Sequence, residues 1–316
     1  MNHQRNIWLD GIMGVVVGDA LGVPVEFIDR EQLEAEPVMN MIGYGTYHLP
    51  KGSWSDDSSM TLATLDSLKQ GYDLLDIMDK FVDWMKKGAY TPFGKMFDIG
   101  NGTYQAITRF IDYRNVKTCG GFTEYDNGNG SLMRIMPICL YLYEKHKKIS
   151  LANDDAIQII HDVSGLTHNH RRSKIACGLY YFIVKAILEQ TCSLKERVQF
   201  GLKEGFDYYE SDIRNLTELS HFERIRNLDE FQNTGKHDIR SSGYVIDTME
   251  AAIWCLITSN SYSECTLKAV NLGQDTDTVA AIAGGLAGLY YGYEMIPQQW
   301  LTVIQRKQWI EDLCQF

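Results

Sequence analysis

Two short acidic motifs are the parts of this sequence best suited to chemistry. The first reads Ser-Asp-Asp at residues 55–57, and the second reads Asp-Thr-Asp-Thr at residues 275–278. Each sets hydroxyl groups beside carboxylates and leads into an apolar run. Oxygen donors of this kind select hard divalent cations such as Mg²⁺ or Mn²⁺, and no nearby His or Cys pattern indicates zinc.

Each motif alone has an ordinary explanation, because Ser, Thr and Asp are preferred helix N-caps and acidic groups favour a helix N-terminus. Three observations favour a shared site. The run after Asp277 is almost all small and apolar, so its N-terminus must lie inside the protein. A turn opened by Gly273 can bring Asp275 and Asp277 together, whereas positions i and i+2 of a regular helix diverge. The two motifs also match in chemistry although they lie far apart in the sequence.

Glu26 is a third acidic feature. It follows a run that ends in Gly22 and is stopped by Pro24, and taken alone it would be a surface acid. Together with the aspartates at 56, 57, 275 and 277 it supplies five negative charges, which two divalent cations balance to about −1. We therefore predict two metals rather than one. Such a pair can hold vicinal hydroxyls, polarise a leaving group and lower the pKa of bound water.

The elements that must position these acids are helices. Apolar residues recur every three or four positions, and nothing alternates convincingly at period two. We therefore predict an all-α fold of ten or more helices in one domain, residues 1–316. The predicted helical stretches are 7–16, 62–68, 74–85, 106–113, 132–143, 156–164, 175–188, 244–257, 265–272, 279–291 and 300–313.

Three stretches lack this period. Residues 38–55 and 118–130 are rich in Gly, Tyr, Asn and Thr and are predicted to be loops that contribute to a site. A polar insertion at about 208–242 has little helical patterning after Leu219. It is interpreted as either a flexible surface excursion or a lid that sets specificity.

Composition excludes some classes of binding partner. The net charge of −11 and a pI near 5.2 repel nucleic acid and anionic membrane surfaces. The start of the chain lacks a signal-peptide pattern, and the low-charge run 279–293, at roughly 15 residues, is short of the ~20 needed to cross a bilayer. Seven cysteines without a CxxC pair indicate reduced thiols and a cytoplasmic protein.

Six segments, in order, resemble the ADP-ribosylglycohydrolase family. They are GDALGVPVEF (18–27), GSWSDDSSM (52–60), FDIGNGT (97–103), GNGSLMRIMP (128–137), SGLTHNH (164–170) and NLGQDTDTVAAIAGGLAGLYYG (271–292). The insertion at 208–242 has no counterpart. The resemblance implies an all-helical fold with two Mg²⁺ or Mn²⁺ ions at its centre. The metal ligands that it implies are Glu26, Ser55, Asp56, Asp57, Asp275, Asp277 and Thr278.

The same resemblance implies a cradle for ADP-ribose. The residues that it implies are Asp98, Gly100, Gly128, Asn129, Gly130, Ser131, Met133 and His168. Other interpretations stay open for some of these positions. The glycine-rich stretch could be a plain loop before a helix capped by Ser131, and Asp98 could cap a helix. Arg134 could bind phosphate or pair with a buried carboxylate.

The implied activity is hydrolysis of the glycosidic bond between ADP-ribose and an acceptor, with Glu26, Asp56, Asp57 and Asp277 as the catalytic set. Glu26 could position or deprotonate the attacking water, serve purely as a ligand, or act as a movable latch. An arginine, serine or acetyl linkage, or another conjugate, would fit the motifs equally. The alternatives are a metal-dependent phosphohydrolase and an inactive ADP-ribose-binding or structural member of the family. Oligomeric state is not indicated.

Overall fold

The computed structural model describes residues 5–149 and 153–316, and within them the protein is helical with no β-strand. Two isolated bridges, Gly121 with His168 and Gly128 with Tyr244, are the β-type pairings in that part of the chain. The first eight α-helices are α1 (Ile7–Gly22), α2 (Arg30–Ala35), α3 (Asp56–Leu68), α4 (Leu74–Lys87), α5 (Asn101–Tyr113), α6 (Met136–Ile149), α7 (Asn153–Gly165) and α8 (Arg171–Glu189). The others are α9 (Leu194–Glu210), α10 (Leu216–Leu219), α11 (Leu228–Phe231), α12 (Val245–Ile257), α13 (Tyr262–Val270), α14 (Thr276–Tyr291), α15 (Gln298–Leu301) and α16 (Lys307–Leu313).

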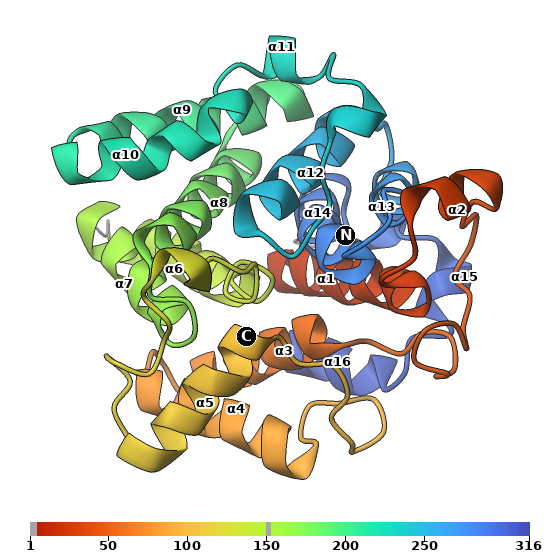
Figure 1. Cartoon of the computed structure of the whole chain (residues 1–316), viewed down its shortest axis with the longest axis horizontal. Helices are drawn as coiled ribbons and strands as arrows, with labels where there is room; N and C mark the ends of the chain where they lie inside the picture. Colours follow the sequence, from red (N-terminus) through yellow and green to blue (C-terminus); the bar gives the residue numbers. More distant parts are fainter. Residues whose placement is uncertain (1–4, 150–152) are drawn as a thin grey trace.

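Helices α1 and α14 form the centre of the molecule (Figure 1). Small residues let their backbones approach closely. A Cβ at Gly18 would stand 2.1 Å from the carbonyl oxygen of Ala280, and one at Gly22 would stand 2.3 Å from the Cα of Asp277. A side chain at either position would force the helices apart. The contact at Gly22 brings the end of α1 against the acidic start of α14.

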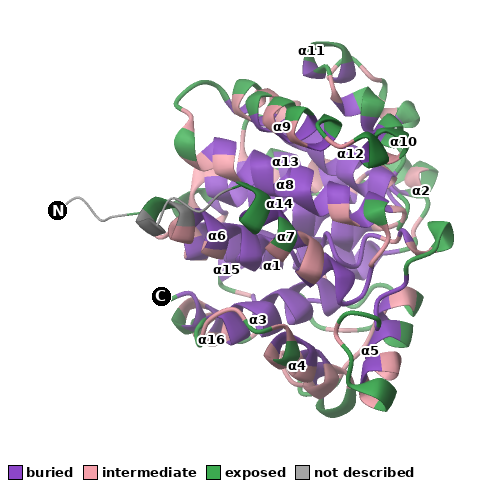
Figure 2. Cartoon of the chain, turned by 90° about the vertical axis from the view of Figure 1, so that its left-hand side faces the viewer, coloured by how far each residue is buried: buried purple, intermediate pink, exposed green. Residues whose placement is uncertain are grey.

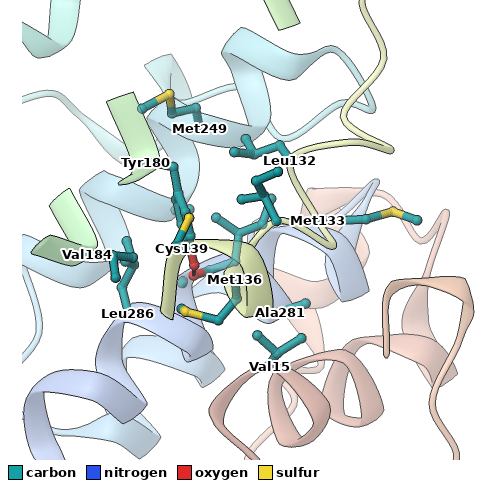
Figure 3. Close-up of a cluster of buried hydrophobic side chains, with 14 of the residues drawn as sticks. Val15, Leu132, Met133, Met136, Cys139, Tyr180, Val184, Met249, Ala281 and Leu286 are labelled. Atoms are coloured by element: carbon teal, nitrogen blue, oxygen red, sulfur yellow. Dashed lines mark hydrogen bonds between the residues drawn. The ribbon is translucent and has the colours of Figure 1, made fainter. Parts of the chain in front are cut away.

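The other helices surround this pair in a burial gradient. In Figure 2, α1, α8 and α14 are almost wholly buried, whereas α4, α5 and α9 expose one face. Figure 3 shows α6 packed into this core, with Met136 near Val15 and Ala281 of the central pair. Each hydrophobic face buried in this way contributes about 25 cal/mol per Å². The acidic motifs are thus fixed to the most rigid part of the fold.

Each predicted helical stretch corresponds to a helix with one exception, although α6 begins at Met136 and not at 132, and α13 ends at Val270 and not at 272. The run 300–313 was predicted as one helix, and this is wrong, because α15 ends at Leu301 and α16 begins at Lys307. Between them the chain turns with Arg306 in the left-handed region, at φ 50°. The amide of Gln305 donates to the carbonyl of Gly52 at 3.0 Å, so contact with a distant loop replaces the helical hydrogen bonds.

The insertion at 208–242 is a packed segment and not a flexible excursion. It consists of short turns, namely η3 (Ile213–Asn215), α10, η4 (Ser220–Ile225), α11 and η5 (Lys236–Asp238). Its apolar side chains are buried in the common core: Leu219, Phe222, Ile225, Leu228, Phe231 and Ile239. Each turn is too short to show the helical period in the sequence.

One stretch, Ile7–Val25, is long and apolar enough to cross a bilayer by length and composition. Within the fold, 89% of its apolar window is buried. This degree of burial is typical of a helix at the centre of a protein core.

Candidate active site

The two acidic motifs meet at the starts of α3 and α14. The hydroxyl of Thr278 donates to Asp57 Oδ2 at 3.2 Å, and the hydroxyl of Ser55 reaches the same oxygen at 3.2 Å. Ser55 is also the N-cap of α3, since its side chain accepts from the Asp57 amide. The capping interpretation is therefore confirmed locally, and the predicted convergence of the two motifs is confirmed as well.

Asp19 of α1 fixes the first motif, and the sequence analysis did not assign it a role. Its carboxylate accepts from the backbone amides of Ser55 and Ser58, each at 3.0 Å, and from the Ser58 hydroxyl. Burial raises the pKa of Asp19 to about 6, against the lowering effect of these hydrogen bonds. An acid inside the otherwise apolar run of α1 was the available signal.

The second motif begins outside its helix, as the turn at Gly273 predicted. Asp275 precedes α14 and its amide donates to the carbonyl of Ser241 at 3.0 Å. The side-chain amide of Asn129 donates to Asp275 Oδ2 at 2.7 Å and to the Thr248 hydroxyl at 3.0 Å. Asn129 thereby joins the glycine-rich loop to the acidic motif.

Glu26, Asp98 and Asp277 form a further group, with one carboxylate oxygen of each lying within 4.8 Å of the others. The Tyr47 hydroxyl, from the loop 38–55, donates to Glu26 Oε2 at 2.7 Å. The capping interpretation of Asp98 is wrong, because α5 begins at Asn101 with Gly100 as its N-cap. The backbone of Asp98 is left-handed, at φ 52°, and its carboxyl group lies beside those of Glu26 and Asp277.

The assembled acids repel one another. Burial, followed by the charge of Asp98, raises the pKa of Glu26 to about 8. Burial is also the main cause that raises the pKa of Asp56, Asp57 and Asp277 well above the usual range, and neighbouring carboxylates add to it. Among the described residues, no Lys or Arg side chain lines this cavity to offset the charge.

Two buried oxygens in this cluster lack any hydrogen-bond partner, Asp57 Oδ1 and Asp277 Oδ2. A buried carboxylate oxygen left without a partner is costly, and such charges are normally paired or coordinate a metal. The donor set is oxygen throughout. These residues therefore fit the hard divalent cations that the sequence predicted.

A cavity of about 360 Å³ opens above the acids. Its lining residues are Glu26, Phe27, Asp56, Asp98, Ile99, Gly100, Asn101, Gly102, Thr103, Gly128, Asn129, Gly130, Met133, His168, Gly243, Asp275 and Thr278. Ser55, Asp57 and Asp277 lie beneath it and are buried. In Figure 3 the side chain of Met133 extends away from the core cluster.

His168 lies between the two glycine-rich walls of the cavity. A Cβ at Gly102, Gly128 or Gly130 would stand 2.8 to 3.3 Å from its imidazole ring, so the glycines make room for the ring. Its Nδ1 is 2.9 Å from the Thr167 hydroxyl. Burial and the nearby Arg134 lower the pKa of His168 to about 3, so the ring is neutral near pH 7.

Two of the predicted substrate-side positions lie behind the cavity wall. Ser131 is fully buried and accepts from the Ser164 hydroxyl at 3.0 Å, and it does not cap a helix, since α6 begins at Met136. Arg134 is also fully buried. It donates to the Val163 carbonyl and, at 2.7 Å, to the Thr167 hydroxyl, so among the described residues it pairs with no carboxylate. Both open interpretations of Arg134 are therefore wrong.

Several residues at this site carry no motif in the sequence. Tyr47 reaches Glu26 from a loop, and Gly243 lines the cavity from the end of the insertion. Phe27 is 63% exposed at the cavity edge and has a left-handed backbone. Exposure of so large an apolar side chain next to acids was not readable from a single sequence.

Comparison with known proteins agrees with this geometry. The ADP-ribosylglycohydrolase family model matches residues 3–316. The chain is 32% identical to the ADP-ribosylarginine hydrolase Tri1 of Pseudomonas putida (strain GB-1), over 96% of this chain and 76% of the relative. It is 28% identical to the ADP-ribosyl-[dinitrogen reductase] glycohydrolase of Rhodospirillum rubrum, over 96% and 92%. A solved ADP-ribosylglycohydrolase-related protein complex aligns with a TM-score of 0.78 and 29% identity, over 98% of this chain and 95% of that one. The all-helical fold, the acidic cavity and these matches together show that the chain belongs to the ADP-ribosylglycohydrolase family.

Proposed function

We propose that this protein is a hydrolase that uses two Mg²⁺ or Mn²⁺ ions to release ADP-ribose from ADP-ribosylated arginine. The observation that carries the proposal is the convergence of buried carboxylates, two of them with unpaired oxygens, beneath a glycine-lined cavity. Family membership supports the ADP-ribose end of the substrate. The metals and the arginine linkage rest on the arguments that follow.

The ligand set that we propose consists of Glu26, Ser55, Asp56, Asp57, Asp275, Asp277 and Thr278, with Asp98 beside them. Support comes from the donor chemistry, since all the side chains offer oxygen. When bound, the two ions supply positive charge that orients the hydroxyls of a ribose and lowers the pKa of a nearby water. The remaining steps are assigned to the side chains and backbone of the chain.

Binding of the diphosphate is assigned to the two glycine-rich walls. The first turn of α5, from Asn101 to Thr103, borders the cavity, and a helix N-terminus offers unpaired backbone N–H groups to an anion. Gly128 and Gly130 line the opposite wall, beside the His168 ring. A neutral His168 can donate or accept at its Nε2 without adding charge. These groups orient the ADP-ribose so that its terminal ribose lies over the acids.

The reaction breaks the bond between the anomeric carbon of that ribose and the acceptor nitrogen. The oxygen of water bonds to the anomeric carbon, and the proton that water loses ends on the leaving nitrogen. Glu26 is the carboxyl group placed to receive and return this proton, and Tyr47 orients it. Positive charge that develops on the ribose is stabilised by the surrounding carboxylates.

The arginine linkage is supported by two observations. The relatives from Pseudomonas putida and Serratia proteamaculans, 32% and 30% identical, are both named ADP-ribosylarginine hydrolases. Asp98, which lies outside the proposed ligand set, leaves a carboxylate at the cavity that suits a guanidinium leaving group, and in the described part of the chain no Lys or Arg side chain lines the cavity. A neutral serine hydroxyl would gain nothing from this charge.

The test uses three substrates: a peptide with ADP-ribose on arginine, a peptide with ADP-ribose on serine, and O-acetyl-ADP-ribose. Each is incubated with the protein in Mg²⁺, in Mn²⁺ or in EDTA, and released ADP-ribose is measured by chromatography. We expect metal-dependent release from arginine at least tenfold faster than from the other two. Release that is equal in EDTA, or fastest from serine, would refute the assignment. Asp277→Asn serves as the inactive control.

A further inference from the structure

One buried side chain, Arg172, joins the segment 208–242 to the wall of the substrate cavity. This arginine lies in the first turn of α8 and is 5% exposed. Neither the family motifs nor the proposed mechanism gives it a role. Its contacts join three parts of the chain that are distant in sequence.

Two of these contacts reach into the segment. The Nε of Arg172 donates to Glu218 Oε2 at 2.8 Å, and Nη2 donates to His221 Nε2 at 2.8 Å. A guanidinium can only donate, so His221 Nε2 is the acceptor of this hydrogen bond. Glu218 is largely covered, with 16% of its side chain exposed. This ion pair is therefore better shielded from solvent than the surface pairs of the same segment.

The other contacts reach the wall of the cavity. Nη1 of Arg172 donates to the Tyr244 hydroxyl at 3.0 Å, and Nη2 lies 3.7 Å from Glu124 Oε1. Glu124 belongs to the loop that leads into the Gly128–Gly130 wall, and Tyr244 stands directly after Gly243 of the cavity lining. One planar guanidinium thus holds the segment and both sides of the wall in a fixed geometry.

Tyr244 transmits this position to the wall through the backbone. The Asn129 amide donates to the Gly243 carbonyl at 3.0 Å, and the Val245 amide donates to the Asn127 carbonyl at 3.0 Å. The Gly128 and Tyr244 backbones form an isolated bridge between these bonds. Displacement of Tyr244 would therefore displace the glycines that face the ligand.

We propose that Arg172 is a positioning residue that makes the segment 208–242 part of the substrate site and sets the affinity for the ADP end of the ligand. This inference rests on the proposed function, because it takes the Gly128–Gly130 wall as the binding surface for ADP-ribose. Arg172 acts only through Tyr244 and the loop 124–130. The proposed ligands at the start of α3 are held separately by Asp19, whereas Asp275 contacts the wall through Asn129 at 2.7 Å.

The experiment compares the wild type with Arg172→Gln, Arg172→Lys and Glu218→Gln. Arg214→Gln is the matched control, since Arg214 lies in the same segment and forms an exposed ion pair with Asp212. We measure KM and kcat on the arginine-linked peptide, the Kd of ADP-ribose and of Mn²⁺ by calorimetry, and amide hydrogen exchange of the ligand-free protein.

For Arg172→Gln we expect KM and the ADP-ribose Kd to rise at least tenfold. The Mn²⁺ Kd and kcat should change by less than the ADP-ribose Kd, within threefold of the wild type, because the ligands on α3 are held by Asp19, and the Asn129 and Val245 amides should exchange faster. Arg172→Lys keeps the positive charge but lacks the planar guanidinium with its several donors. This variant and Glu218→Gln should each give an intermediate rise in KM and in the ADP-ribose Kd. Arg214→Gln should match the wild type.

An unchanged ADP-ribose Kd together with unchanged exchange would overturn the proposal, as would a fall in kcat or in Mn²⁺ affinity at constant KM. If Arg172→Gln fails to fold, Glu218→Gln decides by the same readouts. A wild-type protein that binds ADP-ribose but hydrolyses no conjugate would refute the proposed function, while the Kd and exchange data would still test Arg172.

Discussion

Substitution of Asp277 by Asn tests whether the buried acids are a metal site, because it separates stability from catalysis. Asp277 Oδ1 accepts from the Thr278 amide at 2.9 Å, and an asparagine oxygen can keep that bond. Its Oδ2 has no hydrogen-bond partner. The change therefore removes a charge and a ligand oxygen while leaving the local backbone in place.

The size of the effect follows from charge and mass action. Oxygens of Glu26, Asp98 and Asp277 lie within 4.8 Å of one another, where two full charges repel by about 3.5 kcal/mol at an effective dielectric of ~20. Protons shared within the cluster reduce this, so we expect Asp277→Asn to stabilise the metal-free protein by about 1–2 kcal/mol. In the wild type, metal at about 100 times its Kd adds about 2.7 kcal/mol. The unfolding entropy of ~2.1 cal/mol/K per residue, summed over 316 residues, converts these free energies into shifts in Tm. The expected rise is about 2 °C for Asp277→Asn without metal and about 4 °C for the wild type with metal.

The assay is thermal unfolding in EDTA and in a Mn²⁺ series, followed by circular dichroism. Wild type should melt about 4 °C higher with metal. Asp277→Asn should melt higher than wild type in EDTA and respond little to Mn²⁺. The exposed Asp207→Asn is the control and should behave as wild type. Coincident wild-type curves with and without metal, or a full metal response in Asp277→Asn, would show that the reasoning is wrong.

Three further substitutions test other parts of the account. Tyr47→Phe removes the hydrogen bond to Glu26 and should lower kcat about tenfold with little change in melting temperature, and an unchanged kcat would remove Tyr47 from the mechanism. Gly18→Ala places a Cβ 2.1 Å from the α14 backbone and should lower the free energy of unfolding by about 3 kcal/mol in urea titrations, whereas a neutral effect would contradict the close helix contact. Burial lowers the pKa of His161 to about 3 in the folded protein, against about 6.5 in the unfolded chain. Because the unfolded chain binds this proton more readily, the folded protein loses stability as pH falls from about 6.5 towards 3. From pH 6 to pH 5 the free energy of unfolding should fall by about 1 kcal/mol more in the wild type than in His161→Gln. Parallel plots of this free energy against pH would mean that the folded protein also binds the proton.

Local sequence was enough to predict most of the helices and the acidic motifs that the fold brings together. The helical period is strong in the half-exposed helices α4 and α5, and hydroxyls beside carboxylates before an apolar run are readable without a structure. The break between α15 and α16 was not predicted, because the Gln305 to Gly52 bond replaces helical bonds through a contact between distant residues.

Residues that act through long-range contacts were also missed. Asp19 reaches the site from an apolar helix, where an isolated acid was the available signal, and Tyr47 reaches it from a loop without a pattern of its own. Arg134 follows the glycine-rich motif, yet it turns into the core and binds the Thr167 hydroxyl. Spacing along a chain predicts which residues are near one another only within a helix or a turn.

The most direct test of the central claim is a crystal structure of the protein grown with Mn²⁺, recorded at a wavelength where manganese scatters anomalously. We predict two anomalous peaks among the carboxylates of Asp56, Asp57, Asp275 and Asp277. Both should be weakened or lost in Asp277→Asn. A single peak, no peak at this position, or manganese bound only elsewhere would contradict the two-ion site.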